Sequence, residues 1–264
     1  MRATTVGFSG SGASRRALRW AVQDSAATGW PLHVVVGPGA GHRDLDAVLA
    51  EELLRVPGRE PPVDVTLTTG SVAHALLAAD SAQLVLGCGR DTAPLGPGAG
   101  PVLGVVVPRS TVPVVLVGPQ AVLTPPRRVV VVSSSGDPGS DGSVADRALD
   151  RDLPVRLLTT WSAGSDPAER RHAHLVATGR HHETRARVSA ATHRPVQAEV
   201  VEGRLEDVLP RRLSVGDLLL VAAGTVGTLP VRTLRSPVVL VPAAAPVTID
   251  LRETARGRTA VGVS

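Results

Sequence analysis

Residues 112–118, with the sequence VPVVLVG, return with small changes as SPVVLVP at residues 236–242. The prolines near the start of these runs, Pro113 and Pro237, lie 124 residues apart. That spacing matches a domain and is too long for the repeat of a solenoid. Each run has the length and the valine-rich composition of a buried β-strand. The sequence therefore predicts a tandem duplication in which each unit ends with such a strand.

In the first unit, short apolar runs alternate with amphipathic segments of helical length. We predict strands at residues 3–8, 31–37, 63–70, 82–88 and 112–118, and helices at residues 14–29, 44–56 and 71–79. Ser14 is the expected N-cap of the first helix, and Gly29 is its expected end. Strands that alternate with helices form a parallel sheet through right-handed crossovers, with helices on both faces.

The second unit repeats this order. Its residues 127–136, 153–161, 196–209, 216–224 and 236–243 match, in the same order, the five segments of the first unit that contain its predicted strands. The predicted fold class is α/β, with tandem Rossmann-like domains that each contain a mostly parallel five-stranded sheet. The expected boundaries are residues 1–119 for the first domain, 120–127 for a proline-containing linker, 128–243 for a shortened second domain and 244–264 for a flexible tail.

Composition narrows the class of protein. Of the 264 residues, 43% are hydrophobic, and Cys88 is the single cysteine. No apolar run reaches the roughly 18 to 20 residues that span a bilayer, and no signal-peptide pattern opens the sequence. We therefore expect a cytoplasmic protein that is not bound to a membrane. We interpret Cys88 as a small hydrophobic residue that ends a buried strand, with a reactive thiol beside Arg90 as the alternative.

All 28 basic residues are arginine, and the net charge is +4. Residues 1–120 hold 9 arginines and 9 acidic residues, so the positive excess belongs to the second unit. A nucleic-acid surface usually combines a dense basic cluster with aromatic side chains, and aromatic residues are only 2% of this chain. The composition thus argues against nucleic acid as a partner. The absence of lysine also excludes a Walker-type phosphate loop and Schiff-base chemistry.

The order of elements resembles the universal stress protein family. The resemblance rests on VGFSGSGASRRALRWA at residues 6–21, the strand-glycine-helix unit at Gly70 and the glycine-rich loop before TVPVVLV. It implies a non-enzymatic stress-response protein. It also implies an internal pseudo-dimer, in which the final strands of the units pair in place of a homodimer contact. Hydrophobic edge strands of this kind need such a cover.

Nucleotide-binding members of that family carry V-x-V-D-G-S after the first strand and G-x2-G-x9-G-S/T after the fourth. The resemblance therefore implies an adenine-nucleotide site whose residues are Gly7, Ser9, Gly10, Gly87, Arg90 and Gly100. In such a site glycines let backbone N–H groups approach phosphate, and the pocket lies at the carboxyl ends of the strands.

This chain departs from that motif at the positions that matter for phosphate. Ser9 replaces the Asp, Arg90 replaces the second glycine, and Pro101 replaces the Ser or Thr. Arg90 either distorts the loop or supplies a guanidinium to phosphate in its place. In the second unit, Gly224 and Thr225 match the end of the motif, while about ten preceding loop residues are missing. That unit is expected to bind no nucleotide.

No catalytic or metal-binding constellation is visible. The histidines of residues 169–185 (His172, His174, His181 and His182) lie on a predicted helix without the i, i+4 spacing that binds zinc, so we interpret them as a solvated face. The segment GCGRDT lacks the third glycine of a dinucleotide fingerprint. The serines of SGSGAS lack the frame of a nucleophile elbow. We predict no catalytic residue and no metal ligand.

The sequence leaves more than one function open. The favoured hypothesis is a degenerate module without a cofactor that acts through a protein partner, with the arginine-rich second unit as the contact surface. The alternative is a stress sensor that binds ATP or another adenine nucleotide in the first unit. A third hypothesis, an ATP-hydrolysing enzyme, needs a base or a metal-binding carboxylate near the phosphates, and Ser9 stands where that carboxylate is expected. Further association between chains stays open.

Overall fold

The computed structural model describes residues 2–38, 42–56, 60–89, 100–134, 153–192 and 195–242. The first unit contains β1 (Thr4–Phe8), α1 (Gly12–Thr28), β2 (Leu32–Val36), α2 (His42–Leu54), β3 (Val63–Leu67), α3 (Val72–Ala78), β4 (Gln83–Gly87), α4 (Pro101–Arg109) and β5 (Val114–Val117). The second contains β6 (Arg128–Ser134), β7 (Val155–Trp161), α6 (Pro167–Thr192), β8 (Gln197–Glu202), α7 (Leu205–Arg212), β9 (Asp217–Ala222), the 3-10 helix η1 (Ala223–Thr228) and β10 (Val238–Val241). The expected tail at 244–264 lies outside the described residues.

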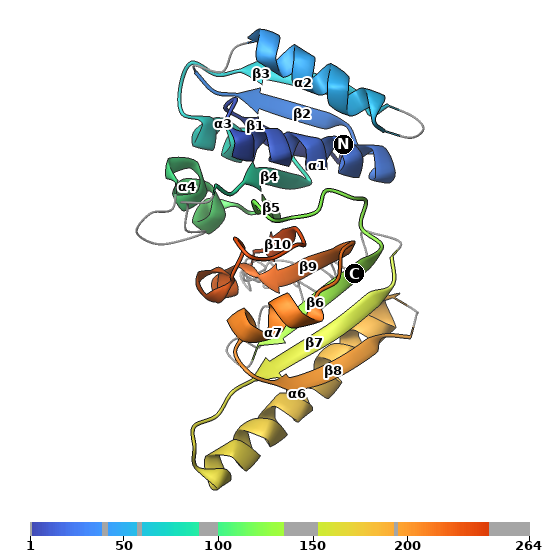
Figure 1. The fold of residues 1–264 in the computed structure, drawn as a ribbon, viewed down its shortest axis with the longest axis vertical. Helices are drawn as coiled ribbons and strands as arrows, with labels where there is room; N and C mark the ends of the chain where they lie inside the picture. Colours follow the sequence, from blue (N-terminus) through green and yellow to red (C-terminus); the bar gives the residue numbers. More distant parts are fainter. Residues whose placement is uncertain are drawn as a thin grey trace, which may run out of the picture.

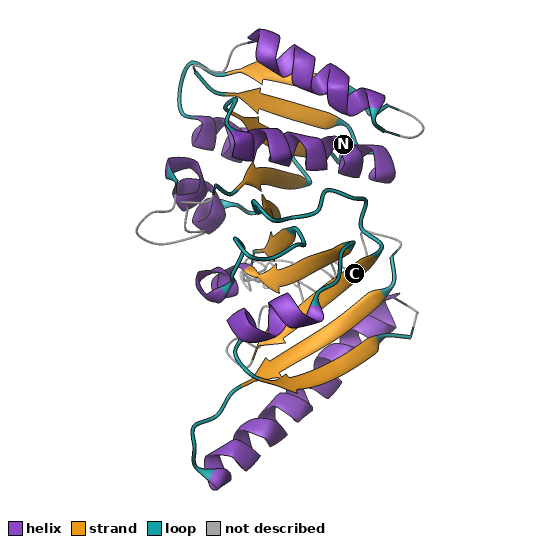
Figure 2. Cartoon of the chain, in the orientation of Figure 1, coloured by secondary structure: helices purple, strands orange, loops and turns teal. Residues whose placement is uncertain are grey.

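In the part of the chain that the structure describes, the strands join one continuous sheet of ten strands in the order β3-β2-β1-β4-β5-β10-β9-β6-β7-β8 (Figures 1 and 2). Within each unit every neighbouring pair is parallel. Where the units meet, β5 and β10 pair antiparallel, with Val239 opposite Val115. The predicted fold class is confirmed, and the final strands pair with each other as the resemblance implies.

The predicted strands all form. The predictions that the structure corrects concern helices. The first helix is capped by Ser11, whose hydroxyl accepts the N–H of Ser14, so the prediction of Ser14 as N-cap was wrong. Gly29 ends that helix in the left-handed region at φ 71°, as predicted. The helix α4 was not predicted, because its valine-rich sequence with Gly104 and Pro108 has weak helical propensity. Its burial against the sheet overrides that propensity.

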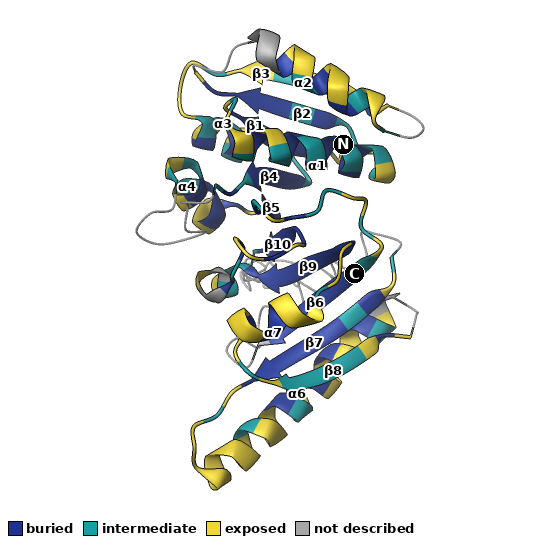
Figure 3. Ribbon diagram, in the orientation of Figure 1, coloured by how far each residue is buried: buried dark blue, intermediate teal, exposed yellow. Residues whose placement is uncertain are grey.

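Apolar cores cover both faces of the sheet and run through both units (Figure 3). On one face the core joins α1 and α2 to α6, with Trp20 and Val188 among its buried members. On the other face it joins α3 and α4 to α7, with Leu103 and Leu209 among its members. The central strands are buried on both sides, which explains their unbroken valine and leucine content. In the described part of the chain, no helix is both long and apolar enough to cross a membrane.

Candidate ligand site in the first unit

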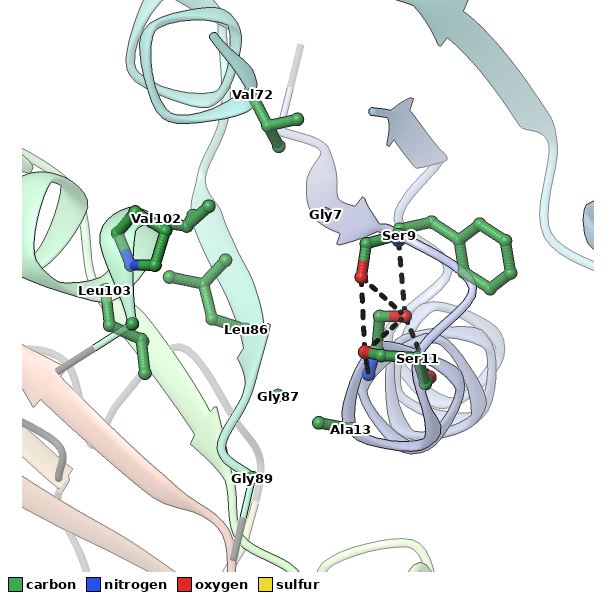
Figure 4. A pocket seen from close by; sticks show the side chains of 14 residues that line it. Gly7, Ser9, Ser11, Ala13, Val72, Leu86, Gly87, Gly89, Val102 and Leu103 are labelled. Atoms are coloured by element: carbon green, nitrogen blue, oxygen red, sulfur yellow. Dashed lines mark hydrogen bonds between the residues drawn. The ribbon is translucent and has the colours of Figure 1, made fainter. Parts of the chain in front are cut away.

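A cavity of about 530 Å³ opens between the carboxyl ends of β1 and β4. The strand order reverses at this point, because β2 and β3 lie on one side of β1 while β4 and β5 lie on the other. An open parallel sheet usually holds its ligand at such a place. The cavity is lined by the start of α1, the start of α4, Val72 of α3 and the ends of both strands (Figure 4).

The polar side of the cavity is a cluster of serine hydroxyls at the N-terminus of α1. The Oγ atoms of Ser9 and Ser11 lie 3.2 Å apart, and each lies within 3.3 Å of the Ser14 Oγ. Ser14 is buried and donates to the carbonyl oxygen of Ser11, whereas Ser9 and Ser11 are exposed. The first turn of α1 contains no acidic residue. Its free N–H groups and dipole therefore favour an anion here.

The opposite side is apolar. Figure 4 shows Leu86, Val102 and Leu103 across the opening from the serine cluster, with Val72 near the top. Gly100 is the N-cap of α4 and Pro101 is its first residue, so neither offers a side-chain hydrogen bond to the helix end. Proline is compatible with this position because its fixed φ suits the first turn. The cavity thus joins an apolar wall to a hydroxyl-rich wall.

Gly87 is explained by packing and not by a ligand. A Cβ atom at this position would lie 2.1 Å from the carbonyl oxygen of Ala13, so only glycine lets β4 pass the start of α1. The neighbouring Cys88 is buried, and burial raises the pKa of its thiol to about 12, while the charge of Arg232 lowers it by a smaller amount. A protonated, buried thiol agrees with the interpretation of Cys88 as a small hydrophobic residue.

The structure brings four of the predicted site residues together, since Gly7, Ser9, Gly87 and Gly100 all line the cavity. Gly10 lies beside the lining at φ 73°, a conformation that favours glycine. Arg90 lies outside the described residues. Sequence reasoning missed Ser11, Ser14 and the apolar wall. The serines had a signal, because they directly follow a predicted strand in SGSGAS, but the apolar residues were assigned only to the core.

The described lining of the cavity is uncharged. None of the lining residues that the structure describes is charged, and none is a histidine, so they offer no general base and no metal-binding carboxylate. Within the described ranges, no group of His, Cys, Asp and Glu side chains is arranged to hold a metal ion. The walls can contact a planar apolar group and hydrogen-bond to a polar one.

The second unit is built differently at the equivalent edge. Between β9 and β10 the chain forms only the short helix η1 and a turn, where the first unit has α4 between β4 and β5. A separate hollow of about 350 Å³ lies where β7 meets α6, lined by Trp161, Pro167, Arg170, Arg171 and His174.

The four histidines of α6 do not form one solvated face. His172, His174 and His182 are exposed, but His181 is buried, and its Nδ1 lies 2.9 Å from the Thr159 Oγ1. The interpretation of a solvated face is therefore wrong for His181. The reason is that α6 packs this turn against β7, which periodicity alone did not show.

Solved structures with the same fold share little sequence with this chain. A Pseudomonas aeruginosa UCBPP-PA14 protein described as a universal stress protein has 13% identity and a TM-score of 0.55, over 92% of this chain and 94% of its own. A universal stress protein from Archaeoglobus fulgidus DSM 4304 has 15% identity and a TM-score of 0.53, over 90% and 98%. A functionally unknown Pseudomonas aeruginosa PAO1 protein has 13% identity and a TM-score of 0.52, over 91% and 92%.

No protein-family model matches the sequence, and no curated protein matches it either. At the identities of the solved structures, the likeness is one of fold, and it extends over about nine tenths of the chain. The element order, the parallel pairing within each unit and the antiparallel junction of β5 and β10 agree with this likeness of fold. This chain has the fold of the universal stress proteins.

Proposed function

We propose that this protein is a non-enzymatic regulatory protein that binds an adenine nucleotide in the cavity of its first unit and none at the equivalent edge of its second unit. The observation that carries the proposal is the cavity of about 530 Å³ at the point where the strand order reverses. Small-molecule sites commonly measure about 300 to 1,000 Å³. The volume therefore suits a nucleotide.

The two walls suit the two ends of a nucleotide. The side chains of Leu86, Val102 and Leu103 offer apolar contact to a base, and the hydroxyls of Ser9 and Ser11 offer hydrogen bonds to ribose or phosphate. The N-terminus of α1 adds roughly half a positive charge. Because no described lining residue carries a full charge, we expect a ligand with one phosphate, such as AMP, to bind better than ATP.

The non-enzymatic part of the proposal follows from the same lining. Hydrolysis of a phosphate bond needs a group that activates water or holds a metal ion, and the described lining residues supply neither. The bound nucleotide is then a signal that stabilises one state of the chain, and the output is a change in its contacts with other molecules.

Titration calorimetry of the full chain with AMP, ADP, ATP and adenosine tests this proposal. Val102→Trp places a large ring in the cavity, whereas Val105→Trp makes the same change one turn further along α4, outside the lining. We expect micromolar AMP binding in the wild type and in Val105→Trp, and at least about a tenfold loss in Val102→Trp. No binding heat up to millimolar AMP, or equal affinity in both variants, would refute the site.

A second candidate function, contact with a protein, is favoured by α6. Leu175 is 69% exposed and Val176 is 37% exposed, on the half of this helix that extends past the ends of β7 and β8 in Figure 1. Sedimentation velocity at increasing concentration, with Leu175→Glu beside the wild type, tests whether this face joins copies of the chain. A larger species that the substitution removes would support it, and a monomer at every concentration would refute it.

A further inference from the structure

The side of α6 that faces the sheet changes its chemistry along the helix. In the C-terminal half this side is buried and carries Ala177, His181, Thr184 and Val188. Their spacing of three or four residues places them on one side of a helix. The same spacing continues back to His174 and Arg170, which are both exposed. The first turns of α6 therefore do not contribute to the core, and they carry basic side chains where the rest of the helix packs on β7.

A hollow of about 350 Å³ lies beside these first turns, at the carboxyl end of β7. Its walls are Pro167, Arg170, Arg171 and His174 of α6 and Trp161, the last residue of β7. Figure 1 shows that this part of α6 extends past the ends of β7 and β8. No described lining residue is acidic. The hollow thus joins a basic helix side to an aromatic side chain on the sheet.

Trp161 and His174 form the aromatic part of the wall. Their ring centroids lie 5.2 Å apart with an angle of 56° between the planes. Trp161 is 8% exposed, and its carbonyl oxygen accepts the N–H of Gly203 at 2.8 Å, so the end of β7 is held in place. Aromatic rings favour tilted or offset contacts with other rings. A flat ligand group can therefore pack against this pair of rings.

The two arginines of the hollow differ in how far their charge is compensated. Arg170 forms an ion pair with Glu202 of β8, and both side chains of this pair are partly exposed. Arg171 is exposed, and within the described ranges its side chain has no ion pair and no hydrogen bond. The hollow therefore contains one guanidinium whose charge and hydrogen-bond donors are available to a ligand.

The backbone at the start of α6 is already occupied. Asp166 accepts the N–H groups of Ala168 and Glu169, at 3.2 and 3.3 Å, in the manner of a helix cap. Neither Asp166 nor Glu169 lines the hollow. An anion in the hollow is therefore bound by a guanidinium and not by free N–H groups of the helix end.

We infer that the hollow is a second ligand site, separate from the cavity of the first unit, and that it takes a small aromatic carboxylate. The carboxylate pairs with the Arg171 guanidinium, whose planar fork matches it with two hydrogen bonds. The ring packs against Trp161 and His174. Small-molecule sites commonly measure about 300 to 1,000 Å³, so a hollow of about 350 Å³ suits one ring with one acidic group.

This site does not depend on the proposed function. It lies at β7, whereas the position in the second unit that corresponds to the cavity of the first is the edge between β6 and β9. The two sites also differ in chemistry, because the first has uncharged described walls and the second has a basic one.

The test follows the indole N–H signal of Trp161 in nitrogen–proton correlation spectra of the full chain, after triple-resonance assignment. Benzoate carries the ring and the charge, benzamide keeps the ring without the charge, and acetate keeps the charge without the ring. We expect benzoate to shift this signal to saturation with a Kd of about 1 mM, and benzamide and acetate to bind at least about tenfold more weakly. The signals of Trp20 and Trp30, in the first unit, should stay in place.

Three variants at exposed positions assign the charge. Arg171→Gln removes it, Arg171→Lys keeps it without the planar fork, and Arg187→Gln removes an exposed arginine of α6 that lies outside the hollow. We expect benzoate binding to weaken about tenfold in Arg171→Gln, to recover in part in Arg171→Lys and to stay unchanged in Arg187→Gln.

The same spectra can refute the site. If benzoate leaves the Trp161 signal in place up to its solubility limit, the hollow takes no aromatic carboxylate. If benzamide binds as well as benzoate, or if Arg187→Gln weakens binding as much as Arg171→Gln, Arg171 does not recognise the ligand and the inference fails. Loss of nucleotide binding to the first unit would leave these readouts unchanged, so the two proposals fail separately.

Discussion

Gly87 shows how a single residue can look like a ligand contact and have a structural cause. In the motif it corresponds to the first glycine of a phosphate loop, yet its nearest neighbour is the backbone of Ala13. A backbone atom cannot move aside as the end of a flexible side chain can. The glycine is therefore required whether or not a nucleotide binds, and its presence alone is weak support for a phosphate site.

We expect Gly87→Ala to lower the free energy of unfolding by about 1 to 3 kcal/mol, because the new methyl group would overlap the Ala13 carbonyl oxygen. Urea unfolding followed by far-UV circular dichroism measures this change. Gly12→Ala is the matched control, since a Cβ atom there would meet nothing within 4 Å. Equal unfolding midpoints for the two variants would show that β4 and α1 are not in close contact.

At the scale of elements, α6 is held to the sheet by only part of its length. Its C-terminal half packs on β7, where His181 is buried beside Thr159, and its N-terminal half is mostly exposed (Figure 3). Burial lowers the pKa of His181, and the nearby charges of His182 and Arg185 lower it further. The folded chain therefore prefers the neutral imidazole, and a proton on His181 opposes the packing of α6.

The stability of the chain should consequently fall at acidic pH through His181. The unfolded chain takes up this proton near the ordinary pKa of about 6.5, whereas the folded chain takes it up only at lower pH. The stability that the neutral His181 contributes to the fold is thus complete above about pH 6.5 and is lost as the pH falls below that value. Urea midpoints at about pH 7.5 and about pH 5.5 measure the loss.

The matched variants for this measurement are His181→Gln and His172→Gln, which remove a buried and an exposed imidazole. We expect the difference between the urea midpoints at the two pH values to shrink in His181→Gln and to persist in His172→Gln. A difference that persists unchanged in His181→Gln would assign the pH dependence to other groups.

At the scale of the whole molecule, the junction of β5 and β10 makes the two units one sheet. Both strands have the sequence VVLV and are completely buried. Arg16 of α1 also donates to the carbonyl oxygens of Gly118 and Ala121. These two residues belong to the segment that leads from β5 to the second unit. Without the second unit, the edge of β5 would be an apolar strand with unpaired backbone groups.

A chain that contains only residues 1–123 should therefore dimerise by pairing β5 with β5 of a second copy, in the antiparallel geometry that β5 and β10 have here. Light scattering coupled to size-exclusion chromatography gives the mass. Val115→Lys in the same fragment places a charge at the centre of the junction and should return the monomer. A monomeric fragment without that substitution would show that β5 does not need a partner.

The sequence by itself determined the duplication, the strands of both units and the parallel order within each unit. These features follow from strand length, from valine and leucine content and from the repeat of VVLV. The pairing of the final strands was implied only by the resemblance to the universal stress protein family. The resemblance to the family motifs indicated Gly7, Ser9, Gly87 and Gly100 as residues of one site, and the structure places all four on one cavity. It misassigned the N-cap of α1 and the burial of His181, because both depend on how an element packs.

Only the tertiary structure decided the rest. The apolar wall of the cavity and the approach of Gly87 to Ala13 both join residues that lie on different elements. Such contacts depend on the twist of the sheet, the seating of α4 and the register at the junction of the units. None of these has a local signature, because each results from the simultaneous packing of both faces of one sheet.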